Sequence, residues 1–377
     1  MNFGFTEDQE ALRDATRKFL DNECPTTFVR KMMADDTAHA TELWKKIAQL
    51  GWLGIIVPED FGGSGGSFLD LVVILEEAGK SLLPGPFFAT ALLGTTTVLA
   101  GGSASQKEAI LPKIVEGNHI VTLALAEKSG RYDAAGVTLT ARAKGNDFVL
   151  WGEKMFVPDA HVADQVIVAA RIGGSGEDGI TLFLVDAKTP GVSISQLKTV
   201  DMTRRQCHIA LQDVPVARTQ VLGEVGKGWP VLRRVLDQAM AGLCAEMVGT
   251  GQRALDMAVS YAKERVQFGK PIGSFQAVKH KCVDMMVQVE NARSLTYYAA
   301  WTVDENVTEA KQAVPMAKAY CSDMGKTVTS EAIQVHGGIG FTWEHDMHLF
   351  YRRALAGEAA FGSAPVHREV VAQTLNL

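Results

Sequence analysis

The chain has 377 residues, of which 47% are hydrophobic and 21% are charged, and its formal net charge is -6. This length allows two or three domains with sizeable cores, and the composition is that of an ordinary soluble globular protein. The negative net charge gives no electrostatic reason to expect nucleic acid or an anionic membrane as a partner.

The N-terminal sequence contains no basic stretch followed by an apolar one, and no apolar run reaches membrane-spanning length. We therefore expect neither a signal peptide nor a transmembrane helix. The five cysteines are odd in number and have neither a metal-ligand spacing nor a disulfide framework, which predicts no metal site and a reducing cytoplasm; they are Cys24, Cys207, Cys244, Cys282 and Cys321.

Two short helices are predicted near the N-terminus. Thr6 followed three residues later by Gln9 is typical of a capping box, and it should open a helix. The inner face of that helix should carry Leu12, Ala15, Phe19 and Leu20, and a second helix should run through Leu43, Trp44, Ile47 and Leu50.

A glycine-rich segment follows at residues 51–66, before another helix that ends in Glu76-Glu77-Ala78. It lacks the Gly-Lys-Ser/Thr of a P-loop, and no βαβ context supports a dinucleotide fingerprint. We interpret it as a structural turn rather than a phosphate cradle.

From about Ile120 the pattern changes to short, β-branched-rich runs separated by Gly, Asn and Asp, which predicts a β domain of roughly a hundred residues. The runs are 120–126, 137–141, 148–151, 165–170, 180–185 and 192–194.

Apolar residues then recur at three- and four-residue steps from Val231 to Ala258, which predicts a long helix. Gly269, Pro271 and Gly273 should end this helical region. Two more helices are expected from His280 to about Asp304 and from Lys311 to about His336, where a glycine cluster follows. The order of these elements indicates an antiparallel helical bundle.

Two motifs in this region resemble the C-terminal half of the acyl-CoA dehydrogenases. The first is Arg-x-Gln-Phe-Gly-Lys-Pro-Ile-x-x-Phe-Gln from Arg265, and the second is Gln-x-His-Gly-Gly-x-Gly-Phe-Thr-x-Glu from Gln334. The resemblance extends over essentially the whole chain. It implies an α+β fold with an N-terminal α-helical domain (1–118), a middle β-barrel domain (119–226) and a C-terminal four-helix bundle (227–377).

The resemblance also implies chemistry. In this family a carboxylate removes the α proton of an acyl-CoA thioester while the N5 atom of FAD accepts the β hydride. The adenine and pyrophosphate end of FAD is held by the bundle of a neighbouring subunit. Here the residues for that end would be Arg265, which suits an anionic pyrophosphate, together with Gln267, Phe268, Gln334, Gly337 and Gly338. The alternative is that Arg265 pairs with a carboxylate and that the glycines only end a helix.

The residues for the isoalloxazine end depart from the family pattern. Where the family usually has Thr-Glu-Pro-x-x-Gly-Ser-Asp, the corresponding segment of this chain starts with Ala126-Glu127. A hydroxyl that would face the flavin is therefore absent. Where the family has Trp-Ile-Thr, this chain has Phe156-Val157-Pro158, and Pro158 cannot donate even a backbone N–H.

The catalytic carboxylate is missing from both positions where the family places it, because Phe361 stands at one and Ala239 at the other. Two carboxylates could substitute. Glu246 lies two helical turns beyond Ala239, about 10 Å along the axis, although a lone Glu on an apolar face is normally ion-paired. Glu358 lies one turn before Phe361, where Arg352, Arg353 and His367 offer ordinary partners. Packing and capping explain His336 and His280.

Three hypotheses follow from this pattern. We favour a partner chain of a heteromeric α2β2 acyl-CoA dehydrogenase, which acts on a bulky or steroid-derived acyl-CoA and lends its bundle to an FAD whose base belongs to a homologous chain. An electron-accepting flavoprotein would be a further partner. The alternatives are a self-sufficient homotetramer with a displaced carboxylate, and a flavin monooxygenase on the same scaffold.

Overall fold

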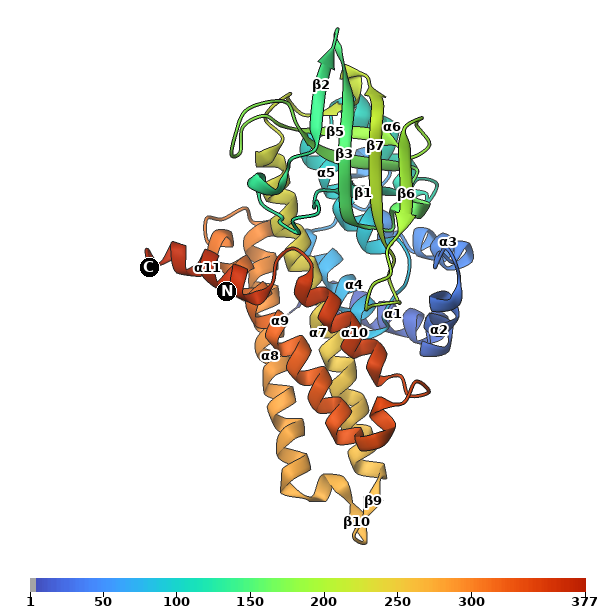
Figure 1. Ribbon diagram of the computed structural model, residues 1–377. Coiled ribbons are helices and arrows are strands. Elements are labelled where there is room, and N and C mark those ends of the chain that lie inside the picture. Colours follow the sequence, from blue (N-terminus) through green and yellow to red (C-terminus); the bar gives the residue numbers. More distant parts are fainter. Residues whose placement is uncertain (1–4) are drawn as a thin grey trace.

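The computed structural model describes residues 5–377. Figure 1 shows a β-rich part at one end, helices beside it, and a long helical bundle that extends away from it. The N-terminal part contains α1 (Glu7–Glu23), α2 (Thr26–Ala34), α3 (Thr41–Gln49), α4 (Phe68–Lys80), the π-helix Phe88–Gly94, α5 (Thr95–Gly101) and α6 (Ala104–Val115).

The predicted capping box at the start of α1 is confirmed, since Thr6 and Gln9 exchange hydrogen bonds in both directions. The prediction for its inner face is partly wrong. Leu20 is buried and Leu12 and Phe19 are half-buried, but Ala15 is exposed and Thr16 is buried instead. In the second predicted helix, the terminal Leu50 is exposed because it caps α3.

The glycine-rich segment 51–66 is a folded turn. Its backbone N–H groups are used internally: that of Ser64 donates to Gly54, that of Gly65 to Val57, and that of Gly66 to Ile55. A Cβ at Gly63 would lie 2.0 Å from the carbonyl oxygen of Val57, so the close approach requires glycine. Because these donors are occupied, the segment does not form a phosphate cradle.

The β domain is one eight-stranded sheet, with β6-β7-β3-β2-β4-β5-β8 in order and β1 paired in parallel with β4. Each of the six predicted runs overlaps one strand, while β7 and β8 were not predicted. The strands are β1 (Val121–Ala124), β2 (Thr140–Lys144), β3 (Asp147–Pro158), β4 (Gln165–Arg171), β5 (Ile180–Asp186), β6 (Val192–Gln196), β7 (Gln206–Val216) and β8 (Val221–Leu222).

The bundle begins with α7 (Trp229–Glu264), followed by a small hairpin of β9 (Val266–Gln267) and β10 (Lys270–Pro271). The remaining helices are α8 (Gln276–Asp304), α9 (Ala310–His336), α10 (Met347–Ala359) and α11 (Ala364–Thr374). Helix α7 crosses α4 closely, because a Cβ at Gly79 would lie 2.0 Å from the Glu246 carbonyl oxygen and one at Gly249 would lie 1.9 Å from that of Glu76. This crossing fixes the N-terminal helices to the bundle.

Helix α7 also sets the spacing between the two ends of the molecule. It has 36 residues, which corresponds to about 54 Å at 1.5 Å per residue. Its first turn lies near the β domain, and the β9–β10 hairpin lies at the opposite end of the bundle (Figure 1). Within one chain, the hairpin is therefore remote from the β domain.

No helix among residues 5–377 is long and apolar enough to cross a membrane.

Candidate functional site

The two motif segments at the far end of the bundle lie together. Arg265 follows α7 directly, and Gln334 lies in the last turn of α9. The ring of Tyr261 on α7 stacks on the ring of His336 on α9, with centroids 4.7 Å apart. This stacking, with the hydrogen bond from the His336 ring to the Ala332 carbonyl oxygen, explains the buried histidine as a packing residue.

Three polar side chains of the two motifs face solvent. Arg265, Gln267 and Gln334 are exposed, and within residues 5–377 their side chains have no hydrogen-bond or ion-pair partner. The backbone of Gly337 has a positive φ of 62°, and nothing lies within 4 Å of the Cβ position of Gly338. This surface therefore offers a free guanidinium, two free amides and an uncovered backbone, which suit the phosphates of a nucleotide.

A second candidate region lies where the β domain meets the bundle. It contains a cavity of about 520 Å³, lined by residues 198–206 on one side and by small residues of α10 on the other. A smaller cavity of about 50 Å³ adjoins it, since Tyr132, Phe156, Arg204, Gln206, Leu243 and Ala360 line both.

The residues that the resemblance places against the isoalloxazine line this region. Ala126 and Pro158 line the smaller cavity, and Phe156 lines both. The carbonyl oxygen of Pro158 accepts a hydrogen bond from the hydroxyl of Thr122 at 2.7 Å, and that of Ala126 accepts one from the N–H of Met155 at 2.9 Å. Neither Ala126 nor Pro158 has a hydroxyl that could bind a flavin ring. Pro158 also lacks a backbone N–H.

Glu127, next to Ala126, has a structural role. Its carboxylate contacts the ammonium of Lys154 at 2.7 Å and accepts backbone N–H groups from Thr138 and Leu139. Burial lowers the pKa of Lys154 to about 8, while Glu127 opposes that shift. This buried pair holds the segment after β1 against β3.

Phe361 occupies the position of the expected base and packs among aromatic residues. Its ring centroid lies 5.2 Å from that of Tyr132 and 6.3 Å from that of Phe88. Its φ of 56° is uncommon for a residue with a side chain. Within residues 5–377, the walls of the 50 Å³ cavity beside it contain no Asp, Glu or His.

Glu246, the first candidate carboxylate, forms a buried ion pair. Its two oxygens accept hydrogen bonds from Arg204, at 2.6 and 2.9 Å, and the side chains are 2% and 11% exposed. Burial opposes the charged form of Arg204, but Glu246 more than offsets it, so the pKa of Arg204 is raised. Sequence reasoning anticipated such a pairing but not Arg204, which lies 42 residues away without any periodic signal.

Glu358, the second candidate, is half-buried and does not appear in the walls of either cavity within the described residues. The partners proposed for it are engaged elsewhere: Arg353 pairs with Asp201, and His367 contacts the Phe361 carbonyl oxygen at 3.0 Å. Arg352 donates to the Val200 carbonyl oxygen at 3.3 Å, so Glu358 pairs with none of the three among residues 5–377. Instead, the buried ammonium of Lys318 donates to the carbonyl oxygens of Glu358 and Gly362 and fixes the loop around Phe361.

Sequence reasoning missed Asp201 and Asp159, and it named Arg353 only as a possible partner of Glu358; Asp201 and Arg353 line the larger cavity. The Arg353 guanidinium donates to Asp201 at 2.7 Å and to the hydroxyl of Thr203. Asp159 is fully buried, and one of its carboxylate oxygens has no partner within the described residues. Burial raises the pKa of Asp159 to about 7, against the opposing effect of Arg204 and Arg353.

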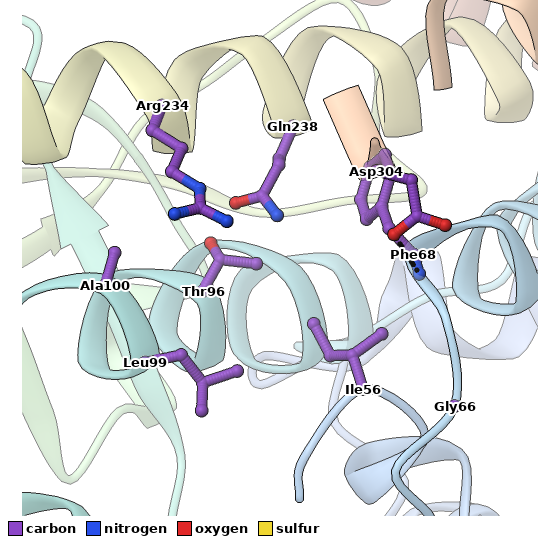
Figure 2. A pocket seen from close by; sticks show the side chains of 9 residues that line it. All are labelled: Ile56, Gly66, Phe68, Thr96, Leu99, Ala100, Arg234, Gln238 and Asp304. Atoms are coloured by element: carbon purple, nitrogen blue, oxygen red, sulfur yellow. Dashed lines mark hydrogen bonds between the residues drawn. The ribbon is translucent and has the colours of Figure 1, made fainter. Parts of the chain in front are cut away.

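A separate cavity of about 210 Å³ lies between α5 and α7. Figure 2 shows Arg234 and Gln238 projecting from α7 toward Thr96 on α5. At its far side Asp304 accepts the backbone N–H of Phe68 at 3.1 Å, so this carboxylate caps the start of α4 (Figure 2). None of the candidate site residues from the sequence lines this cavity.

Three family models match consecutive parts of the chain. They describe the acyl-CoA dehydrogenase N-terminal domain at residues 6–118, the middle domain at 122–214 and the C-terminal domain at 226–376. A probable acyl-CoA dehydrogenase of Bacillus subtilis, YngJ, is 33% identical over the full length of both chains.

Two solved structures are similar throughout. Butyryl-CoA dehydrogenase from Megasphaera elsdenii has a TM-score of 0.92 at 30% identity and covers 100% of both chains. The Tcur3481-Tcur3483 steroid ACAD has a TM-score of 0.88 at 30% identity and covers 98% of both.

The chain belongs to the acyl-CoA dehydrogenase family, whose members are FAD-dependent oxidoreductases. Its residues fit this cofactor unequally. The exposed guanidinium, amides and glycines at the end of the bundle suit the nucleotide end of FAD. The junction of the β domain and the bundle presents Ala126, Phe156 and Pro158, which do not fit the polar edge of the isoalloxazine.

Proposed function

We propose that this chain is the partner subunit of a heteromeric acyl-CoA dehydrogenase. In such an enzyme it contributes its bundle end to an FAD whose isoalloxazine and catalytic carboxylate belong to a homologous chain. The observation that carries this proposal is Phe361, an aromatic side chain at the position of the base. A phenyl ring cannot accept the α proton of an acyl-CoA thioester.

The surroundings of Phe361 support the proposal. The cavity of about 50 Å³ beside Phe361 is the smaller of the two at this junction, and Phe361 forms part of its wall. Among the residues that the structure describes, the polar residues in its wall are Tyr132, Arg204 and Gln206. Tyr132 is a poor base here, because burial raises its pKa and disfavours the phenolate.

The position of the nucleotide motif supports a cofactor shared between chains. Arg265 and Gln334 lie at the end of the bundle that is opposite to the chain's own β domain (Figure 1). A flavin bound by these residues would have to meet the β domain of another chain. The proposed enzyme must therefore be an oligomer.

Exposed apolar side chains at this end support association with another chain. Phe268 at the hairpin is 91% exposed and Phe341 is 77% exposed. Other exposed apolar residues follow on the same end or on the adjoining part of α8: Val266, Val283, Met286, Val287, Ile339 and Trp343. Clusters of this kind on a protein surface usually mark interaction sites.

The proposed substrate is a bulky acyl-CoA, such as one derived from a steroid. The support is the similarity over 98% of the chain to the steroid ACAD named Tcur3481-Tcur3483. An electron-accepting flavoprotein would reoxidise the reduced cofactor. We further propose a cytoplasmic location, which agrees with five cysteines that form no disulfide.

The test is acyl-CoA dehydrogenation with an artificial electron acceptor. The full chain is purified alone, and also after co-expression with any homologous chain encoded beside it. We expect turnover only from the co-expressed complex. Turnover by the chain alone would favour the self-sufficient homotetramer, and oxygen-dependent turnover of reduced flavin without acyl-CoA would favour a monooxygenase.

A further inference from the structure

Residues 198–206, which lead from β6 into the first residue of β7, connect the β domain to the bundle by two ion pairs. Arg204 contacts Glu246 of α7, at 2.6 and 2.9 Å. Asp201 contacts Arg353 of α10 at 2.7 Å, and these two side chains are each 5% exposed. The two contacts reach different helices of the bundle.

Both ion pairs lie at the 520 Å³ cavity. Asp201, Arg204 and Arg353 are part of its wall. Opposite the segment, the wall is formed by small or aliphatic residues of α7 and α10 and the residue after α10: Leu243, Leu355, Ala356, Gly357, Ala359 and Ala360. The ion pairs therefore bridge the two walls at the place where, by family resemblance, a flavin ring would be expected to separate them.

Removing one partner of a buried ion pair strongly lowers the stability of a folded protein. Removing one charge leaves the other uncompensated in a low-dielectric environment, whereas replacing both by apolar residues is often neutral. The chain contains a contrasting contact between the same two domains: Arg233 of α7 and Glu177 of the β domain form an ion pair whose side chains are 52% and 57% exposed. Exposed pairs of this kind contribute little to stability.

We infer that the junction cavity of this chain holds no flavin ring, and that the two buried ion pairs hold the β domain on the bundle in its place. The inference rests on the proposed function, because a partner subunit needs a stable junction without a ring of its own. Three observations carry it: Ala126 and Pro158 offer no hydroxyl to a ring, Phe156 faces the cavity, and the 198–206 segment is already anchored to α7 and α10.

The test compares Glu246→Gln with Glu177→Gln in the full chain, by thermal melting and by hydrogen exchange of peptides covering 198–206. Glu246→Gln should lower the melting temperature by several degrees and speed exchange in that segment, whereas Glu177→Gln should change neither. The double variant Arg204→Met/Glu246→Leu should recover most of the lost melting temperature. The ion-pair role would be overturned if the two single variants had the same melting temperature and exchange rates. It would also be overturned if the double variant melted no higher than Glu246→Gln.

Riboflavin, which has the ring but no adenine nucleotide, tests the cavity itself. At its solubility limit it should leave exchange in 198–206 and 355–361 unchanged, and saturable protection of these peptides would overturn the inference. Both measurements use this chain without any partner and without turnover. Activity of the chain alone would contradict the proposed function separately, so the two failures can be told apart.

Discussion

The ring of Phe361 lies 5.2 Å from the ring of Tyr132, at the position where the family's catalytic carboxylate is expected. Phe361 is half-buried and its ring packs against Tyr132 and Phe88, so Phe361→Glu places a carboxylate among aromatic rings and should not create an active chain. It should lower the free energy of unfolding by roughly 1 kcal/mol, because the carboxylate is partly desolvated. Phe361→Leu is the apolar control. Turnover by purified Phe361→Glu alone would contradict this prediction.

Arg265 should matter for cofactor retention in the complex. Its guanidinium is exposed and unpaired within the described residues, so Arg265→Met removes a partner for pyrophosphate without disturbing a contact in this chain. We expect the co-expressed complex to lose FAD, with affinity lowered by about 10-fold or more. Lys263→Met, which removes an exposed charge from the last turn of α7, should leave the flavin absorbance unchanged.

Glu358 should not be the base. Its side chain does not appear in the walls of the cavities beside Phe361, among the residues the structure describes. Glu358→Gln in the co-expressed complex should therefore keep kcat near the wild-type value, whereas loss of a general base typically costs about 100-fold or more. A drop of that size, with the acidic limb of the pH–rate profile removed, would assign the base to this chain.

Asp159 should make stability depend on pH. Its pKa is about 7 in the folded chain, raised by burial from 3.8. Between these values the unfolded chain loses the proton while the folded chain keeps it, so the contribution of Asp159 is fully present below about pH 4 and is lost as pH rises through 7. The loss is at most roughly 4 kcal/mol.

Asp159→Asn should remove this dependence, and asparagine tolerates the positive φ of 50° at this position. The informative quantity is the difference in unfolding free energy between the variant and the wild type, measured by chemical denaturation from pH 4 to 8. As pH rises, the unfolding free energy of Asp159→Asn should increase relative to that of the wild type. A flat difference would show that Asp159 ionises normally.

Local patterns predicted most elements because each is encoded within a few turns of chain. The capping box of Thr6 and Gln9, the helices α7 to α9 and six strands follow from periodicity and capping. Strand β7 was missed although its first six residues alternate between half-buried and buried, because His208, Gln212 and Asp213 interrupt the apolar run. Ala15 was misplaced because α1 buries Thr16 on a narrow face.

The site was predictable only in part, because some of its contacts join segments that are far apart in the sequence. The nucleotide motif is contiguous in sequence, so Arg265 and Gln334 could be named in advance. The partners that decide the junction come from distant segments: Arg204 meets Glu246 across 42 residues, and Asp201 meets Arg353 across 152. No spacing rule links such pairs, since tertiary packing alone brings them together. The structure also shows that Lys318 holds the loop of Phe361, which no local pattern indicated.

The central claim is that this chain completes the cofactor site of another chain and has no complete site of its own. The most direct measurement is the molar ratio of FAD to polypeptide in the co-expressed complex, from flavin absorbance and quantitative amino-acid analysis. One FAD for every two chains, with no FAD on this chain purified alone, is the result that our account predicts. One FAD per chain, or stoichiometric FAD on this chain alone, would contradict it.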